Sequence, residues 1–246
     1  MLLSYQKSIK ASGFEQGKEP EKAVDENVQT WWRADTAEAG AWLELNLEKH
    51  FTVHAVQINF ADDGLMPEIP VDAALTGALG QECWIDEKPQ RTRWKLEGSL
   101  DGVNYSMIED KSAAETDLPH DLVVREEGIT VQYLRLTVCE LPYGQAACVS
   151  GFRVFGLGDG TAPGKASEVT VKRTGDLDME VVWNGDTDTV GYVVEWGYTP
   201  TKLYHSYQVF GTSVHIGALV KGQEVYVRVD SFNENGITDG DIIAVK

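Results

Sequence analysis

Cysteine is scarce in this chain of 246 residues, which contains only Cys83, Cys139 and Cys148. An odd and sparse set does not make the disulfide framework of small secreted domains, and CxxC metal spacing is missing. Cys139 and Cys148 lie in apolar, strand-like runs, so we expect buried free thiols. A Cys139–Cys148 disulfide is the alternative.

Long apolar runs are also missing. No segment approaches the roughly 20 apolar residues of a transmembrane helix. The apolar start, Met1–Leu3, is too short for the core of a signal peptide, so we expect any export signal to lie outside this chain. Because a chain can be a fragment, this absence does not indicate a cytoplasmic protein.

Basic residues are few relative to acidic ones. The chain has 21 Lys and Arg residues against 39 Asp and Glu residues, a net charge of −18, and both halves are acidic. Such a chain repels nucleic-acid phosphates and anionic lipid. We therefore expect no nucleic-acid partner and no membrane insertion, whereas a neutral or cationic ligand remains open.

Helical periodicity is nearly absent, and short β-rich runs separated by turn residues take its place. The runs are 42–47, 51–60, 93–99, 131–138, 150–156, 179–184, 191–197, 204–211 and 224–232. Many short strands with turns between them are typical of β-sandwiches. The segment GLGDGTAPGK (156–165) has the Gly and Pro content of a linker. We predict an all-β chain of two sandwiches, 1–157 and 165–246, joined by 158–164.

A long polar and Gly-rich insertion, residues 61–91, separates two predicted strands. Loops of this length are usually functional or disordered. The insertion carries Trp84 among acidic residues, and its segment 72–80 could form one short helix.

Catalytic motifs are missing as well. There is no GxSxG or HExxH motif, and the five histidines are scattered. Asp62 and Asp63 form the best local carboxylate pair, but adjacent carboxylates in a loop are more often solvated or metal-bound than catalytic. Glycoside hydrolysis needs two carboxylates about 5–10 Å apart, one with a raised pKa. Chance provides such pairs among so many acidic residues, so we predict no catalytic residue.

Five motifs follow one another in the order of a known family. They are AVDENVQTWW (23–32), GAWLELNLEKHFTVHAVQINF (40–60), RWKLEGSLDGVNYSMIEDKS (93–112), QYLRLTV (132–138) and VSGFRVFG (149–156). As a set they resemble the discoidin, or coagulation-factor C-terminal, type of domain. This is the galactose-binding-like jelly-roll β-sandwich that many bacterial carbohydrate-binding modules use. The resemblance covers the chain up to about residue 157.

The remaining residues, 163–246, resemble a fibronectin type III β-sandwich. VVWN and GYVVEWG match its early strands, and LVKGQEVYVRVDSFNENG is similar to its closing hairpin. The resemblance makes Tyr226 the corner tyrosine that bonds back to upstream backbone. Because the spacing from Leu219 to Tyr226 is one residue long, Val220 is expected to take the packing role of that leucine.

The combination is similar to the C-terminal accessory region of secreted bacterial glycoside hydrolases, especially those of family 43. It implies non-catalytic binding of a glycan or polysaccharide, a catalytic domain upstream of Met1, and a secreted, periplasmic or bacterial cell-surface location. The alternatives are a structural scaffold that supports the catalytic domain, and a protein or cell-surface adhesion module.

The two adjacent tryptophans of AVDENVQTWW pose a separate question, because neighbours on a strand point to opposite faces. In the family the last Trp packs in the core, which makes Trp32 a core residue and turns Trp31 outward. An outward Trp can stack on a sugar ring, or the insertion or the second domain can cover it. The other predicted core tryptophans are Trp42 and Trp94 in the first sandwich and Trp183 and Trp196 in the second.

The predicted glycan site is shallow and lies at one end of the first sandwich. It combines one or two aromatic side chains with loop residues that hydrogen-bond sugar hydroxyls. The predicted ligand-binding residues are Trp31, Arg33, Asp63, Trp84 and Tyr143.

The polar residues of the same motif suggest a metal ion. In the family this turn often holds a structural calcium, and Asp25, Asn27 and Thr30 occupy the matching positions. Hard cations prefer several oxygen ligands at short range. Two departures weaken the match, since Glu26 replaces the usual glycine and Gly151 stands where the family often has a carboxylate. The alternative is an Asx-type turn whose side chains bond backbone amides.

Overall fold

The structure is a computed structural model of the whole chain, and it describes residues 1–67, 69 and 86–246. Two sequence predictions, the short helix over 72–80 and the ligand-binding role of Trp84, fall outside the described residues. Among the described residues, no helix is long and apolar enough to cross a membrane.

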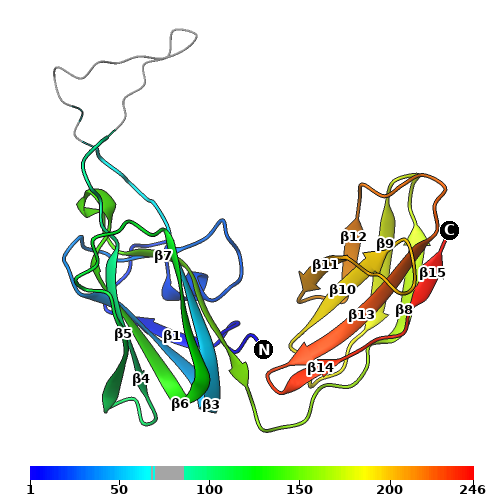
Figure 1. Ribbon diagram of the computed structural model, residues 1–246, viewed down its shortest axis with the longest axis horizontal. Helices are drawn as coiled ribbons and strands as arrows, with labels where there is room; N and C mark the ends of the chain where they lie inside the picture. Colours follow the sequence, from blue (N-terminus) through cyan, green and yellow to red (C-terminus); the bar gives the residue numbers. More distant parts are fainter. Residues whose placement is uncertain (68, 70–85) are drawn as a thin grey trace. The chain divides into compact units, whose positions relative to one another are not determined.

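The chain divides into two compact units, Leu3–Phe155 and Gly156–Lys246, the latter together with Met1–Leu2 (Figure 1). The described regular elements are antiparallel strands and two short 3-10 helices, η1 (Pro20–Ala23) and η3 (Pro142–Gly144). The predicted all-β fold class is confirmed.

The first unit is built on one seven-stranded sheet in the order β2-β7-β3-β6-β4-β5, with β1 beside β3. The strands are β1 (Ser8–Ala11), β2 (Trp32–Arg33), β3 (Ala41–Phe60), β4 (Arg93–Ser99), β5 (Tyr105–Asp110), β6 (His120–Glu140) and β7 (Cys148–Leu157). Strands β3 and β6 pair along nearly their whole length, from Ala41 opposite Val138 to Asn59 opposite His120. The predicted runs 42–47 and 51–60 are therefore one strand. The pairing of β3 with β6 contains register shifts of the β-bulge type, which bend a strand without ending its hydrogen-bonded pairing.

Alternation along the strands builds the first core. In β3, Leu43 and Leu45 are fully buried, and the intervening side chains face outward. Trp32 and Trp94 are buried, as predicted. The prediction for Trp42 is wrong, because the alternation that buries Leu43 turns Trp42 to the outer face. There its ring centroid lies 5.3 Å from the guanidinium carbon of Arg135.

The second unit is a sandwich of two antiparallel sheets. One has the order β12-β9-β8, and the other has the order β11-β10-β13-β14, with β15 also paired to β13. The strands are β8 (Ser167–Arg173), β9 (Met179–Asn184), β10 (Gly191–Gly197), β11 (His205–Val209), β12 (Ser213–Ile216), β13 (Val225–Asn233), β14 (Gly236–Thr238) and β15 (Ile243–Val245). Both sheets contribute to one apolar core, in which Trp183 and Trp196 are buried as predicted.

Two predictions for the closing hairpin of the second unit are wrong. The Tyr226 hydroxyl donates to Glu224 Oε2 at 2.6 Å rather than to upstream backbone. A carboxylate two residues away is a stronger acceptor than a backbone carbonyl. Leu219 is buried, whereas Val220 is 49% exposed. Leu219 therefore keeps the packing role that we assigned to Val220.

Residues 158–164, the predicted linker, are bonded to the second unit. The Gly158 amide donates to the carbonyl of Glu234 at 2.8 Å. Ser231 Oγ donates to the carbonyl of Gly164 at 2.6 Å. This segment is therefore held along its length by residues of the second sandwich.

Cys139 and Cys148 are free thiols, as predicted, and the alternative disulfide between them is not formed. The predicted burial holds for Cys148 but not for Cys139, which is only partly buried. Cys148 is fully buried at the start of β7. Burial raises the pKa of its thiol to about 12. A thiol in this state behaves as a small apolar core residue.

Candidate functional site

Loops gather at one end of the first unit because three long strands begin or end there. Asn59, near the end of β3, pairs with His120 at the start of β6. The amide of Ala61, just beyond β3, donates to the carbonyl of Cys148 at the start of β7. The pairing of β2 with β7 brings Trp31, which precedes β2, to the same end. Residues distant in sequence therefore meet here.

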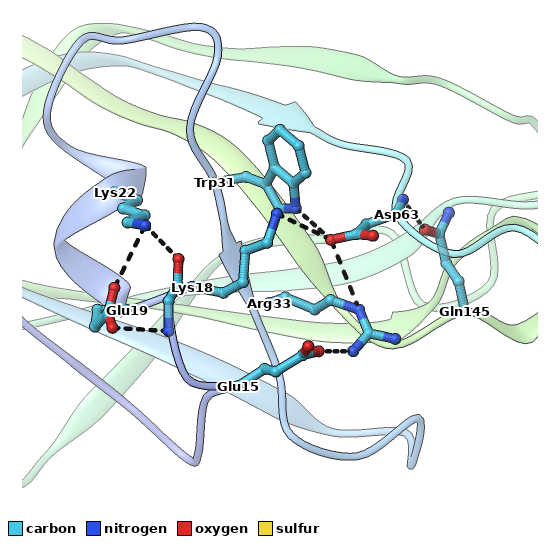
Figure 2. A network of polar contacts seen from close by, with 9 residues as sticks. Glu15, Lys18, Glu19, Lys22, Trp31, Arg33, Asp63 and Gln145 are labelled. Atoms are coloured by element: carbon cyan, nitrogen blue, oxygen red, sulfur yellow. Dashed lines mark hydrogen bonds and ion pairs between the residues drawn. The ribbon is translucent and has the colours of Figure 1, made fainter.

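Trp31 and Asp63 form the centre of this end (Figure 2). The indole Nε1 of Trp31 donates to Asp63 Oδ2 at 2.8 Å. Lys18 Nζ lies 3.2 Å from the same carboxylate oxygen and 3.3 Å from the centroid of the Trp31 ring. A cation over the face of an indole is attracted by its π-electrons. One face of Trp31 is thus occupied by Lys18, and the indole is held in one orientation.

Arg33 lies beside this pair. Its guanidinium is ion-paired with Glu15, and its Nε lies 4.0 Å from Asp63 Oδ2. Arg33 Nε is buried and has no hydrogen-bond acceptor among the described residues. The Asp63 amide donates to Gln145 Oε1 at 3.1 Å, which fixes the loop that carries the carboxylate. Three of the predicted ligand-binding residues are therefore brought together.

The charges of this network favour an ionised Asp63. The hydrogen bond from Trp31 is the main cause that lowers the pKa of the Asp63 carboxyl. The positive charges of Lys18 and Arg33 lower it further. Asp63 is thus a carboxylate with three nearby donors, while both basic side chains already have acidic partners.

A groove of about 210 Å³ adjoins the network. Gln145 joins the two, because its Nε2 donates to Asp62 Oδ1 at 3.0 Å while its Oε1 accepts from Asp63. The floor is partly apolar, and the polar groups are hydroxyls, an amide and two carboxylates. The groove is lined by Phe60, Ala61, Asp62, Leu65, Thr92, Asp117, Pro119, Leu141, Pro142, Tyr143 and Gln145.

Tyr143 presents its ring at this groove. It lies in η3 with φ of 59°, an uncommon conformation for a non-glycine residue, and it is 36% exposed. Its amide donates to Gln90 Oε1 at 2.9 Å, which anchors the turn. Desolvation is the main cause that raises the pKa of the Tyr143 hydroxyl. The carboxylates of Asp86, Asp117 and Asp62 add to the shift, so the groove has an acidic mouth.

Lys18 and Gln145 are functional candidates that sequence reasoning missed. Lys18 lies in a polar loop between β1 and η1, where nothing in the local pattern distinguishes it from other surface lysines. Gln145 is two residues beyond Tyr143, so the predicted ligand-binding role of Tyr143 was the nearest indication in the sequence that this loop is functional. Both residues make contacts with residues that are distant in the sequence and that lie nearby only in the folded chain.

The predicted metal-binding residues form a hydrogen-bonded turn. The Asn27 amide donates to Asp25 Oδ1 at 2.8 Å, and Thr30 Oγ1 donates to Asp25 Oδ2 at 2.6 Å. Glu26 adopts a φ of 60° and pairs with Arg153, 2.9 Å away on β7. Among the described residues, no group of three or more His, Cys, Asp or Glu side chains is placed to hold a metal ion. The carboxylate oxygens that calcium would use are therefore engaged by protein donors.

No protein-family model and no curated protein matches the chain. Solved structures are similar to it over 61–63% of its length. The module CpGH89CBM32-6 of Clostridium perfringens is 12% identical, covers 61% of this chain and 94% of its own, and has a TM-score of 0.45. Chitosan-binding module 2 of a Paenibacillus sp. IK-5 chitosanase/glucanase, solved with chitotriose, is 16% identical, with 63% and 99% covered and a TM-score of 0.47.

A third similar structure is the CBM32 module of AlyQ in complex with 4,5-unsaturated mannuronic acid. It is 16% identical, covers 63% of this chain and 98% of its own, and has a TM-score of 0.44. At these identities the similarity assigns no ligand to this chain.

Proposed function

We propose that the first unit binds glycans without catalysing a reaction, through the end where its loops gather. The observation that carries the proposal is the convergence of Trp31, Asp63 and Gln145, from three separate segments, beside the groove that presents Tyr143. Sugar sites combine aromatic or apolar surface with a few well-placed hydrogen-bonding groups. This end of the unit offers both.

The ligand class follows from the charges around the groove. Asp62 and Asp117 line it, and Asp86 lies against the Tyr143 hydroxyl. The basic side chains of the adjoining network, Lys18 and Arg33, are paired with carboxylates. Like charges repel, and the whole chain has a net charge of −18. We therefore propose neutral or amino sugars as ligands, in preference to uronic acids.

The wider setting is also a proposal. The chain would be the accessory region of a secreted bacterial polysaccharide-degrading glycoside hydrolase, with its catalytic domain upstream and a location outside the cytoplasm. The second unit would be a fibronectin type III-like domain, and its two-sheet sandwich supports that assignment.

Calorimetric titration with oligosaccharides tests the binding proposal. Dissociation constants between millimolar and micromolar, about −4 to −8 kcal/mol, are expected for a shallow site. Tyr143→Ala and Asp63→Ala should each weaken binding roughly tenfold, since each removes a group worth about 1–2 kcal/mol. Glu127→Ala, which removes an exposed carboxylate from β6 outside the groove, is the matched control and should bind normally.

The variants must melt as cooperatively as the unchanged protein for the comparison to count. If no sugar binds to folded protein, or if Tyr143→Ala and Asp63→Ala bind like the control, the proposal is wrong. The scaffold alternative would then take its place.

A further inference from the structure

One edge of the second sandwich lacks charge. No Asp, Glu, Lys or Arg occurs from Leu203 to Val220, although charged residues make up 24% of the chain. This stretch contains β11 and β12, which are edge strands of the two sheets. Proteins often use charged residues to protect exposed edge strands from unwanted pairing. The uncharged edge therefore calls for another explanation.

Aromatic rings lie in a continuous row along this edge. The ring centroids of Tyr204 and His205 are 4.5 Å apart, and those of His205 and Trp196 are 5.2 Å apart, with the planes nearly parallel at 22°. Trp196 also contacts Tyr207, and the centroids of these two rings are 5.1 Å apart. We call Tyr204, His205, Trp196 and Tyr207 the aromatic row.

The register of β11 places the row on one face of the sheet. His205 pairs with Trp196 and Tyr207 with Val194, so both β11 side chains lie on the face that Trp196 occupies. Trp196 is 8% exposed, whereas Tyr207 is 50% and Tyr204 is 53% exposed. The buried indole thus supports an outer layer of aromatic rings that remains half open to solvent.

The polar groups of the outer rings are available as well. Within the described part of the chain, the side chains of Tyr204, His205 and Tyr207 make no hydrogen bond, whereas the hydroxyl of Tyr226 is bonded. Apolar ring faces combined with unbonded hydroxyl and imidazole groups match the alternating C–H and O–H surface of a sugar chain.

We propose that the aromatic row is a second glycan-contact surface, which takes a neutral polysaccharide chain. The inference rests on the proposed glycan-binding function of the first unit, but its residues are separate. The uncharged stretch offers no complement to the carboxylates of an acidic polysaccharide. Lys202, whose Nζ lies 5.8 Å from the Tyr204 ring centroid, stands at the end of the row. Two weak sites on one chain raise its retention on a polymer through effective concentration.

The test is affinity electrophoresis of the full chain in gels that contain soluble xylan, mannan or mixed-linkage glucan, with pectate as the acidic comparison. The row variant is the double substitution Tyr204→Ala and Tyr207→Ala. The matched control is Ser206→Ala with Gln208→Ala, on the opposite face of the same strand. Tyr204→Phe with Tyr207→Phe keeps the stacking surface and removes both hydroxyls.

The row variant should be retarded roughly threefold less than the unchanged protein by a neutral polysaccharide. The control should behave like the unchanged protein, and the phenylalanine variant should lie between them. Binding of short oligosaccharides at the first unit should not change in the row variant.

Three results would be decisive. If Tyr143→Ala loses retardation but the row variant does not, this inference is wrong and the proposed function stands. If only the row variant loses it, the row is supported and the site proposed in the first unit is wrong. If neither Tyr143→Ala nor the row variant loses retardation, neither surface binds the polysaccharide and the inference is overturned.

Discussion

At the scale of single residues, the two adjacent tryptophans have opposite environments. Trp32 has no exposed surface, and its Nε1 donates to the carbonyl of Gly13 at 3.0 Å. Trp31 is half-buried and held by Asp63 and Lys18. The family resemblance placed Trp32 in the core, and alternation then turned its neighbour outward, because only one of two neighbours can face the core. Neither could predict Lys18, which no short-range pattern links to Trp31.

This difference predicts unequal effects on folding. Trp32→Ala should lower the free energy of unfolding of the first unit by about 3–5 kcal/mol, through lost burial and a residual cavity. Trp31→Ala should cost clearly less, because its indole is partly solvated. Urea unfolding followed by fluorescence measures both. A Trp31 variant that is as unstable as the Trp32 variant would contradict these environments.

Cys148 gives a second prediction at this scale. Burial raises the pKa of its thiol to about 12, and thiolate is the reactive form. In a Cys83→Ser variant, Cys148 should therefore resist alkylation at about pH 8 and should react once urea unfolds the chain. Peptide mass analysis identifies the alkylated cysteine. Rapid modification of Cys148 in folded protein would show that β7 opens at its start.

Asp63 gives a pH-dependent prediction whose sign follows from its lowered pKa. The carboxylate contributes stability above its unfolded pKa of about 3.9, and the contribution is lost as pH falls through the folded value. Asp63→Asn should therefore be less stable than the unchanged protein near neutral pH, and the difference should shrink in acid. Thermal melts across this range test it. A difference that grows in acid would mean that the Trp31 and Lys18 contacts do not hold the anion.

At the scale of elements, the turn over residues 25–30 can be either a calcium site or a hydrogen-bonded turn. The resemblance predicts calcium at Asp25, Asn27 and Thr30, whereas the structure shows their oxygens bonded within the turn and Glu26 paired with Arg153. We expect no change in melting temperature between excess calcium and chelator, because ligation would break these bonds. A rise of several degrees with calcium would show that the turn holds the metal after all, since binding to the native state stabilises it.

The strands were largely predictable from alternation and turn residues, but their continuity and their outward faces were not. β3 is one strand because its ladder to β6 survives an irregularity that resembles a turn in the sequence. Trp42 was misplaced because a family match outweighed the alternation set by Leu43 and Leu45. Tyr226 was misplaced because a nearby carboxylate, Glu224, competes for its hydroxyl. In each case a specific local contact decided the outcome.

At the scale of the whole molecule, the acidic charge and the uncharged edge of the second unit favour the same class of ligand. The first unit presents an acid-lined groove, and the second presents uncharged aromatic rings. Binding of neutral sugars should therefore depend little on salt, whereas weak binding of an acidic oligosaccharide should improve as salt screens the repulsion. Titrations at low and high ionic strength measure this. Tighter binding of uronic-acid oligomers at low salt would contradict the proposed ligand class.

The most direct test of the central claim follows the Trp31 indole N–H by two-dimensional NMR during titration with neutral and amino-sugar oligosaccharides. This signal reports the hydrogen bond to Asp63, and the spectrum of Trp31→Phe assigns it. The fully buried Trp94 provides an internal control. A saturable shift of the Trp31 signal, with Trp94 unmoved, is the predicted result. Binding that leaves Trp31 unmoved, or no binding at all, would contradict a glycan site at this end of the first unit.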